Sequence, residues 1–95
     1  INHSIIANIY ADNNDVYVKQ MQNGSKSLTL NIYNDWNEVD IIQKKNVAHT
    51  ATITLTGTNP TDLFLTQTGN TTQTYSLSQN CVTAGGCSVS ITQGN

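Results

Sequence analysis

The segment Val16-Tyr17-Val18-Lys19-Gln20 places an apolar residue at every second position and closes on glutamine. The same pattern returns at Val39-x-Ile41-x-Gln43, Leu63-x-Leu65-x-Gln67 and Val89-x-Ile91-x-Gln93. The four glutamines lie 23, 24 and 26 positions apart, and such a period is typical of repeat proteins, whose units bury their apolar faces against one another. We therefore expect a single repeat domain over residues 1–95, built from units near residues 4–24, 25–47, 48–70 and 71–95.

Each glutamine-ended segment is preceded by a second alternating run. These runs are Ile5-x-Ala7-x-Ile9, Leu28-x-Leu30-x-Ile32, Ala51-x-Ile53-x-Leu55 and Tyr75-x-Leu77-x-Gln79. Alternation with a period of two, rich in Ile, Val, Thr and Tyr, indicates β-strands rather than helices. Each unit therefore reads as a strand, a turn and a second strand.

The spacing between units is constant, whereas the turn inside each unit varies. From each closing glutamine to the first apolar residue of the next unit there are always eight positions, as from Gln20 to Leu28. The turn inside a unit spans seven to ten positions. A constant link favours a solenoid, because every rung must rise by the same step. We predict an all-β fold, a two-sheet β-solenoid of four strand-turn-strand rungs, with rungs ~4.8 Å apart.

Alternation also assigns side chains to faces. The closing glutamines fall on the inward face, where a buried amide needs its donors and acceptors satisfied. Stacked amides can do this by bonding up and down a column, so a stacking ladder is predicted for Gln20, Gln43, Gln67 and Gln93. On the outward face, Asn8 and Asn31 are predicted to form a second ladder.

Composition narrows the classes of function. The chain is 37% apolar and 11% charged, with a net charge of −2. A composition with so few basic residues does not favour the positively charged surface that binds nucleic acid. No apolar run approaches the ~18 residues of a membrane span. Neither nucleic-acid binding nor membrane insertion is expected. The chain opens on Ile1 without a signal-peptide pattern, which suggests a mature, processed form.

Candidate catalytic and metal-binding residues are few. His3 and His49 are expected far apart in rung position and have no Cys, Ser or acid at triad-like offsets, so neither enzymatic activity nor a cofactor is expected. Stacking would put Asp15, Glu38 and Asp62 in one column. Such a column is either a site for Ca²⁺ or another cation, or a solvated acidic edge that discourages sideways association. The second interpretation is favoured.

Cys81 and Cys87 flank a turn with the sequence Val-Thr-Ala-Gly-Gly. Two strands joined by such a turn can bring the pair within bridging distance. We predict a disulfide, with a reduced pair as the alternative. The loop is short, so the bridge stabilises by only roughly 2 kcal/mol in the chain-entropy model. A disulfide would indicate an oxidising, extracellular setting.

The repeats resemble the curlin repeat, the unit of the curli amyloid fibres on bacterial surfaces, which runs Gln-x-Gly-x-x-Asn-x-Ala-x-x-x-Gln. All four closing glutamines match, and the remaining matches are Asn14 and Asn37 for Asn, Gly57 for Gly and Gln79 for the opening Gln. The Ala position holds the larger Val16, Val39, Leu63 and Val89, and the Gly and Asn positions of the fourth unit hold Cys81 and Cys87.

The resemblance covers nearly the whole chain and implies a secreted fibre subunit or nucleator. It implies a place on the bacterial cell surface or in a fimbrium, and a role in biofilm matrix or adhesion. A nucleator or a secretion chaperone would be a further partner.

The ends of the stack are expected to promote polymerisation. The strand pattern runs from Ile5 to Gln93, which leaves no room for a capping helix. End rungs with unpaired backbone groups can bind a second copy head to tail and form an open filament. The predicted polymerisation edges are Ile5, Ala7, Ile9, Val89 and Ile91. The alternatives are a discrete secreted β-solenoid binding module, such as an adhesin or phage-fibre segment, and an antiparallel β-sandwich pilin.

Three large apolar side chains are expected to point outward. They belong to Tyr17, Ile42 and Phe64. They form either a lateral contact between protofilaments or partner subunits, or scattered surface residues of the ordinary kind.

Overall fold

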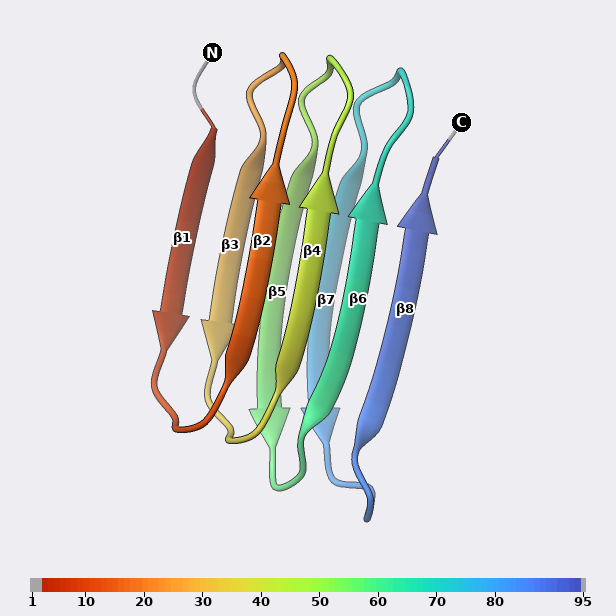
Figure 1. Ribbon diagram of the computed structural model, residues 1–95. Coiled ribbons are helices and arrows are strands. Elements are labelled where there is room, and N and C mark those ends of the chain that lie inside the picture. The colour runs from red at the N-terminus through yellow and green to blue at the C-terminus, as the bar shows by residue number, and fades with distance from the viewer. Residues whose placement is uncertain (1–2, 95) are drawn as a thin grey trace.

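The computed structural model describes residues 3–94, so the predicted processed start at Ile1 and the last residue of the fourth unit, Asn95, lie outside it. The elements described are β1 (Ser4–Ile9), β2 (Asp15–Gln20), β3 (Ser27–Ile32), β4 (Glu38–Gln43), β5 (Thr50–Gly57), β6 (Thr61–Gln67), β7 (Thr74–Cys81) and β8 (Cys87–Gln93). They form two four-stranded sheets with the strand orders β1-β3-β5-β7 and β2-β4-β6-β8 (Figure 1).

Each unit contributes one strand to each sheet, so the chain winds as a solenoid of four rungs. β1 and β2 form the first rung, and β7 and β8 the fourth. All neighbouring strands within a sheet are parallel and pair without a shift in register. The two sheets face each other, and their strands run in opposite directions (Figure 1). The predicted all-β, two-sheet β-solenoid of four rungs is confirmed.

The three links between rungs are equally long, with six residues between a closing glutamine and the next strand. The second residue of each link has a left-handed backbone, with φ of 70° at Gln22, 82° at Lys45 and 114° at Gly69. The side-chain oxygen of Gln22 accepts the backbone N–H of Lys45 at 2.7 Å. One link therefore supports the next, and their equal geometry explains the constant spacing in the sequence.

The core lies between the sheets and is most complete in the two middle rungs. The buried apolar side chains there are Leu28, Leu30, Ile32, Val39, Ile41, Ala51, Ile53, Leu55, Leu63 and Leu65. Apolar side chains of the end rungs are only partly buried against them, as at Val16, Val18, Tyr75, Leu77, Val89 and Ile91. An end rung has a neighbour on one side only, so its inward side chains lose less of their water-exposed surface on folding.

Two glycines mark places where one rung approaches the next too closely for a side chain. Gly24 has φ +92°, and a Cβ there would lie 2.5 Å from the backbone of Val47. A Cβ on Gly57, with φ +116°, would overlap the carbonyl oxygen of Cys81. Gly85 also has φ +92°, but a Cβ there would meet nothing within 4 Å. Stacking requires the first two glycines, whereas only the turn conformation favours the third.

Candidate functional site

Four glutamine side chains form a continuous hydrogen-bonded column between the sheets. Nε2 of Gln20 donates to Oε1 of Gln43 at 2.8 Å, Gln43 donates to Gln67 at 2.7 Å, and Gln67 donates to Gln93 at 2.8 Å. Gln43 and Gln67 are fully buried. The predicted stacking of these amides is confirmed.

The same Nε2 atoms also tie the two sheets together. Each donates to a backbone carbonyl at the start of the odd strand in its own rung. The acceptors, in rung order, are Ser4, Ser27, Thr50 and Thr74, at 3.1, 3.2, 3.1 and 3.3 Å. Unpaired amide groups would be costly in this interior, so the column replaces the hydration that burial removes.

The column has a direction. In each of the three amide–amide hydrogen bonds, the donor lies nearer the first rung and the acceptor nearer the fourth. The column therefore ends in the acceptor Oε1 of Gln20 at the first rung and in an N–H donor of Gln93 at the fourth. An acceptor at one end complements a donor at the other, so a second column can extend the first head to tail.

The end rungs leave apolar inward side chains exposed. Ile5 is 50% and Ile9 43% exposed, whereas their neighbours in the second rung are fully buried. The structure places all five predicted polymerisation-edge residues on the inward side of an end rung, namely Ile5, Ala7, Ile9, Val89 and Ile91.

His3 and His49 lie two rungs apart, but they occupy the same position relative to their rungs, which was not expected. The register of the odd strands places both in one column at the ends of the links, with Lys26 in the rung between them and Gln73 after them. Lys26 and His49 are fully buried. A signal for this was present, because alternation extended two positions upstream from Leu28 puts Lys26 on the inward face.

Backbone carbonyls hold the buried ammonium group of Lys26. Its Nζ donates to the carbonyl oxygens of Asn23, Gly24 and Lys45 at 3.0, 3.2 and 2.6 Å. Three N–H donors thus meet three acceptors, which makes burial of the cation tolerable. Burial lowers the pKa of Lys26.

A buried acceptor at the fourth rung lacks a partner. Within residues 3–94, Oε1 of Gln73 makes no hydrogen bond. In the same column, Nδ1 of His3 accepts the N–H of Lys26 at 3.2 Å, and Nδ1 of His49 accepts the N–H of Gln73 at 3.3 Å. The two histidines of this column thus accept the N–H of the following rung, and Gln73 occupies the same column at the fourth rung.

His49 makes stability depend on pH. Its Nε2–H donates to the carbonyl of Lys44 at 2.9 Å while Nδ1 accepts the N–H of Gln73, which requires the neutral ring. Burial lowers the pKa of His49 below the ordinary 6.5, the hydrogen bond to Lys44 raises it, and the charge of Lys26 lowers it. The unfolded chain therefore takes up the proton more readily. The free energy of unfolding should be highest above pH 6.5 and should fall as the pH drops from there towards the folded pKa.

We expect the urea concentration at the unfolding midpoint to decrease as the pH is lowered from about 7.5 to about 5. His49→Gln should flatten this dependence, because a glutamine oxygen can accept the N–H of Gln73 without titrating. His3→Gln is the matched control, since His3 occupies the same column but is exposed. It should leave the dependence in place. Equal pH dependence in His49→Gln and the unmodified chain would contradict the role of His49.

Cys81 and Cys87 form the predicted disulfide, with their Cα atoms 5.9 Å apart. The bridge joins the end of β7 to the start of β8 and closes the turn of the fourth rung.

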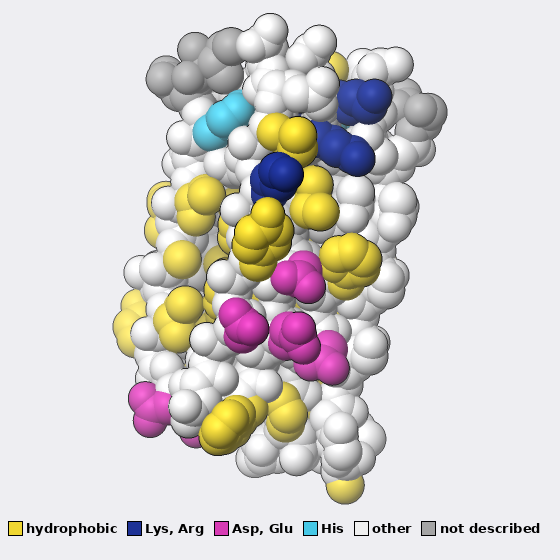
Figure 2. Space-filling view, in the orientation of Figure 1, with side chains coloured by type: hydrophobic (Ala, Val, Ile, Leu, Met, Phe, Trp, Pro, Cys, Tyr) yellow, Lys and Arg dark blue, Asp and Glu magenta, His cyan; other side chains and the backbone are white. Residues whose placement is uncertain are grey.

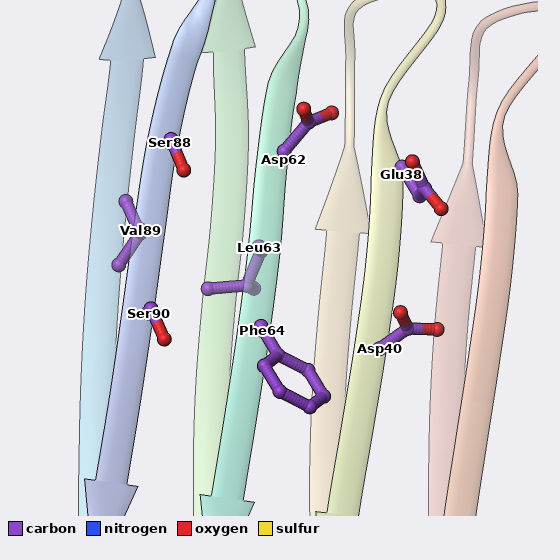
Figure 3. Close-up of a pocket in the computed structure, with 8 residues that line it drawn as sticks. All are labelled: Glu38, Asp40, Asp62, Leu63, Phe64, Ser88, Val89 and Ser90. Carbon is purple, nitrogen blue, oxygen red and sulfur yellow. The ribbon is translucent and has the colours of Figure 1, made fainter.

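The register aligns Asp15, Glu38 and Asp62 on the outer face of the even strands, as predicted. Within residues 3–94, however, no three His, Cys, Asp or Glu side chains gather closely enough to hold a metal ion. The cation-site interpretation is therefore not supported. Glu38 and Asp62 instead line a shallow hollow of about 330 Å³, together with Asp40 and Phe64 (Figure 3).

The outward asparagine ladder is also present. Nδ2 of Asn8 donates to Oδ1 of Asn31 at 3.0 Å. The column continues with Thr54 and Ser78, so the amide pair is confined to the first two rungs.

No family model, curated protein or solved structure matches this chain. In residues 3–94 no helix is long and apolar enough to cross a membrane. The resemblance to the curlin repeat stays a prediction from the sequence.

Proposed function

We propose that this chain is a structural subunit of an extracellular, curli-like amyloid fibre in which copies stack head to tail. The fourth rung of one copy contacts the first rung of the next, so that β7 pairs with β1 and β8 with β2. The observation that carries the proposal is the direction of the glutamine column, with an acceptor at one end and a donor at the other.

The residues that would meet at this joint are compatible. Applying the register of neighbouring rungs once more puts Gln93 next to Gln20 of the following copy, so the amide column continues. It puts Ser88 next to Asp15. Like charges on adjacent strands destabilise a sheet, and the uncharged Ser88 keeps two carboxylates from meeting there.

The joint also covers what the end rungs leave open. The same register would place the backbone of His3 in the next copy beside Gln73, so the column of Lys26, His49 and Gln73 would continue. Ile5 and Ile9 would become as buried as their counterparts in the second rung. Removing this apolar area from water favours association.

Two further features support an extracellular setting. Disulfides persist mainly in oxidising compartments, which supports an extracellular location. The curlin resemblance supports a bacterial surface fibre that serves biofilm matrix or adhesion, with a nucleator or secretion chaperone as a further partner.

The test is assembly of the purified, disulfide-bonded chain at rising concentration. We expect filaments in electron micrographs and a diffraction reflection near ~4.8 Å along the filament axis. Ile5→Lys should raise the concentration at which filaments appear at least about tenfold, because the joint would bury the added charge. Ile6→Lys is the matched control, since Ile6 is similarly exposed at 53% but points outward.

A chain that stays monomeric or trimeric at every concentration would contradict the fibre and support the alternative, a discrete secreted β-solenoid binding module. Equal assembly of the two lysine variants would contradict the proposed joint.

A further inference from the structure

Charged side chains gather on one face of the molecule and are separated along it. The outer face of β2, β4, β6 and β8, here called the charged face, has acidic side chains towards the strand starts and lysines towards the strand ends (Figure 2). The acidic group is Asp15, Glu38, Asp40 and Asp62, and the basic group is Lys19 with Lys44 and Lys45 of the link after β4. The described strands of the other sheet, β1, β3, β5 and β7, contain no charged residue.

Exposed apolar side chains occupy the two middle rows of this face, where Tyr17 and Phe64 flank Asp40 and Ile42 lies beside Lys19. Tyr17 is 53% and Phe64 49% exposed, and Ile42 is half-buried. Figure 2 shows yellow side chains beside the magenta and dark blue ones, and Figure 3 shows the residues that line the hollow beside Phe64. Aromatic side chains are enriched in protein contact surfaces. A face on which apolar side chains alternate with charges of both signs is therefore suited to binding another protein surface.

The charge arrangement is complementary to itself. When a second copy faces the first with its strands antiparallel, the acidic group of each lies opposite the basic group of the other. With parallel strands, acids would face acids and lysines would face lysines, which opposes binding. The charges therefore indicate a second copy of this chain, in the antiparallel orientation, as the occupant of the face.

We propose that two copies pair through their charged faces about a two-fold axis parallel to the stacking direction of the rungs. The row of Asp15, Glu38 and Asp62 then faces the partner's Lys44, and the row that contains Asp40 faces the partner's Lys19. The contact is isologous, so each pairing occurs twice.

This pairing goes beyond end-to-end stacking and does not require it. A two-fold axis parallel to the stack reverses the strand direction but keeps the rung order. Two stacks paired in this way would run in the same direction, so the two contacts are compatible. A chain that cannot stack would still form a dimer.

The experiment measures the dimer by sedimentation velocity in the full chain carrying Ile5→Lys, which blocks the end joint. One variant adds Lys19→Glu and Lys44→Glu, and another adds Asp40→Lys and Asp62→Lys. Each variant alone puts like charges opposite each other, so its dissociation constant should rise at least about tenfold. An equimolar mixture of the two should pair again, because a largely acidic face then meets a largely basic one.

The control matched to the Asp40→Lys and Asp62→Lys variant adds Asp12→Lys and Asp35→Lys, which raise the net charge by the same amount but lie in turns away from the charged face. It should pair like the parent, and circular dichroism should confirm that all variants fold. Carbodiimide cross-linking of isotope-labelled with unlabelled copies should join Lys44 of one copy to Glu38 or Asp62 of the other.

Three results would overturn the pairing: a parent that stays monomeric at every concentration, a mixture that pairs no better than its components, or a control that is as impaired as the variants. Failure of end-to-end stacking would look different. Filaments would be absent from the unblocked chain, while the dimer of the blocked chain would persist.

Discussion

Replacing Gln43 by leucine is expected to lower the free energy of unfolding by about 3 kcal/mol. Leucine has a similar volume, so most apolar packing would be kept. The substitution removes the acceptor of Gln20 and leaves Oε1 of Gln67 and the carbonyl of Ser27 without their donor. Buried groups left unpaired in this way cost about 1–3 kcal/mol each. Urea unfolding followed by circular dichroism measures the loss.

Gln79→Leu is the matched control for this prediction. Gln79 lies in an inward column whose other members are Ile9, Ile32 and Leu55. Leucine therefore continues an apolar column there, and the free energy of unfolding should change by less than about 0.5 kcal/mol or rise. A similar loss in both variants would mean that the amide column contributes no specific stability.

Gly24→Ala is expected to destabilise the chain by about 3 kcal/mol. A left-handed backbone with φ +92° already disfavours alanine, and the new Cβ would lie 2.5 Å from the backbone of Val47. The link that contains Val47 cannot move away without changing the step between rungs. Thermal unfolding should show the loss as a fall in melting temperature of more than about 10 °C.

Gly85→Ala separates backbone strain from contact between rungs. Gly85 has the same φ as Gly24, but a Cβ there meets nothing within 4 Å. Only the strain of about 1 kcal/mol should remain. Equal losses at the two positions would show that the links do not limit the approach of successive rungs.

The sheets could be predicted from the sequence because a solenoid repeats its register. Once the constant spacing from Gln20 to Leu28 is recognised, the same offset places every later strand beside its predecessor. Alternation then decides which side chains face inward, as it did for Gln43 and Gln67. Local pattern and global fold agree at these positions, which is why short-range reasoning was sufficient.

The buried column at the ends of the links, which contains Lys26 and His49, could not be predicted in the same way. Lysine is almost never fully buried, and Lys26 is tolerated only because three carbonyls from two different links converge on it. That convergence depends on turn geometry, which composition does not reveal. For Asp15, Glu38 and Asp62 the sequence pattern could instead suggest a cation site that the structure does not support. Side chains in one column project in parallel from strands ~4.8 Å apart, whereas Ca²⁺ ligands must converge on one point.

The turn between β7 and β8 gives the molecule a tether point. The disulfide between Cys81 and Cys87 closes its base, and Gly85 at its tip faces open space. Foreign sequence grafted there would leave the rise per turn of the solenoid unchanged, whereas the same graft in a link would displace every later turn of the solenoid. Each subunit could therefore display a cargo, such as a peptide epitope or a small enzyme, at regular intervals along an assembled array.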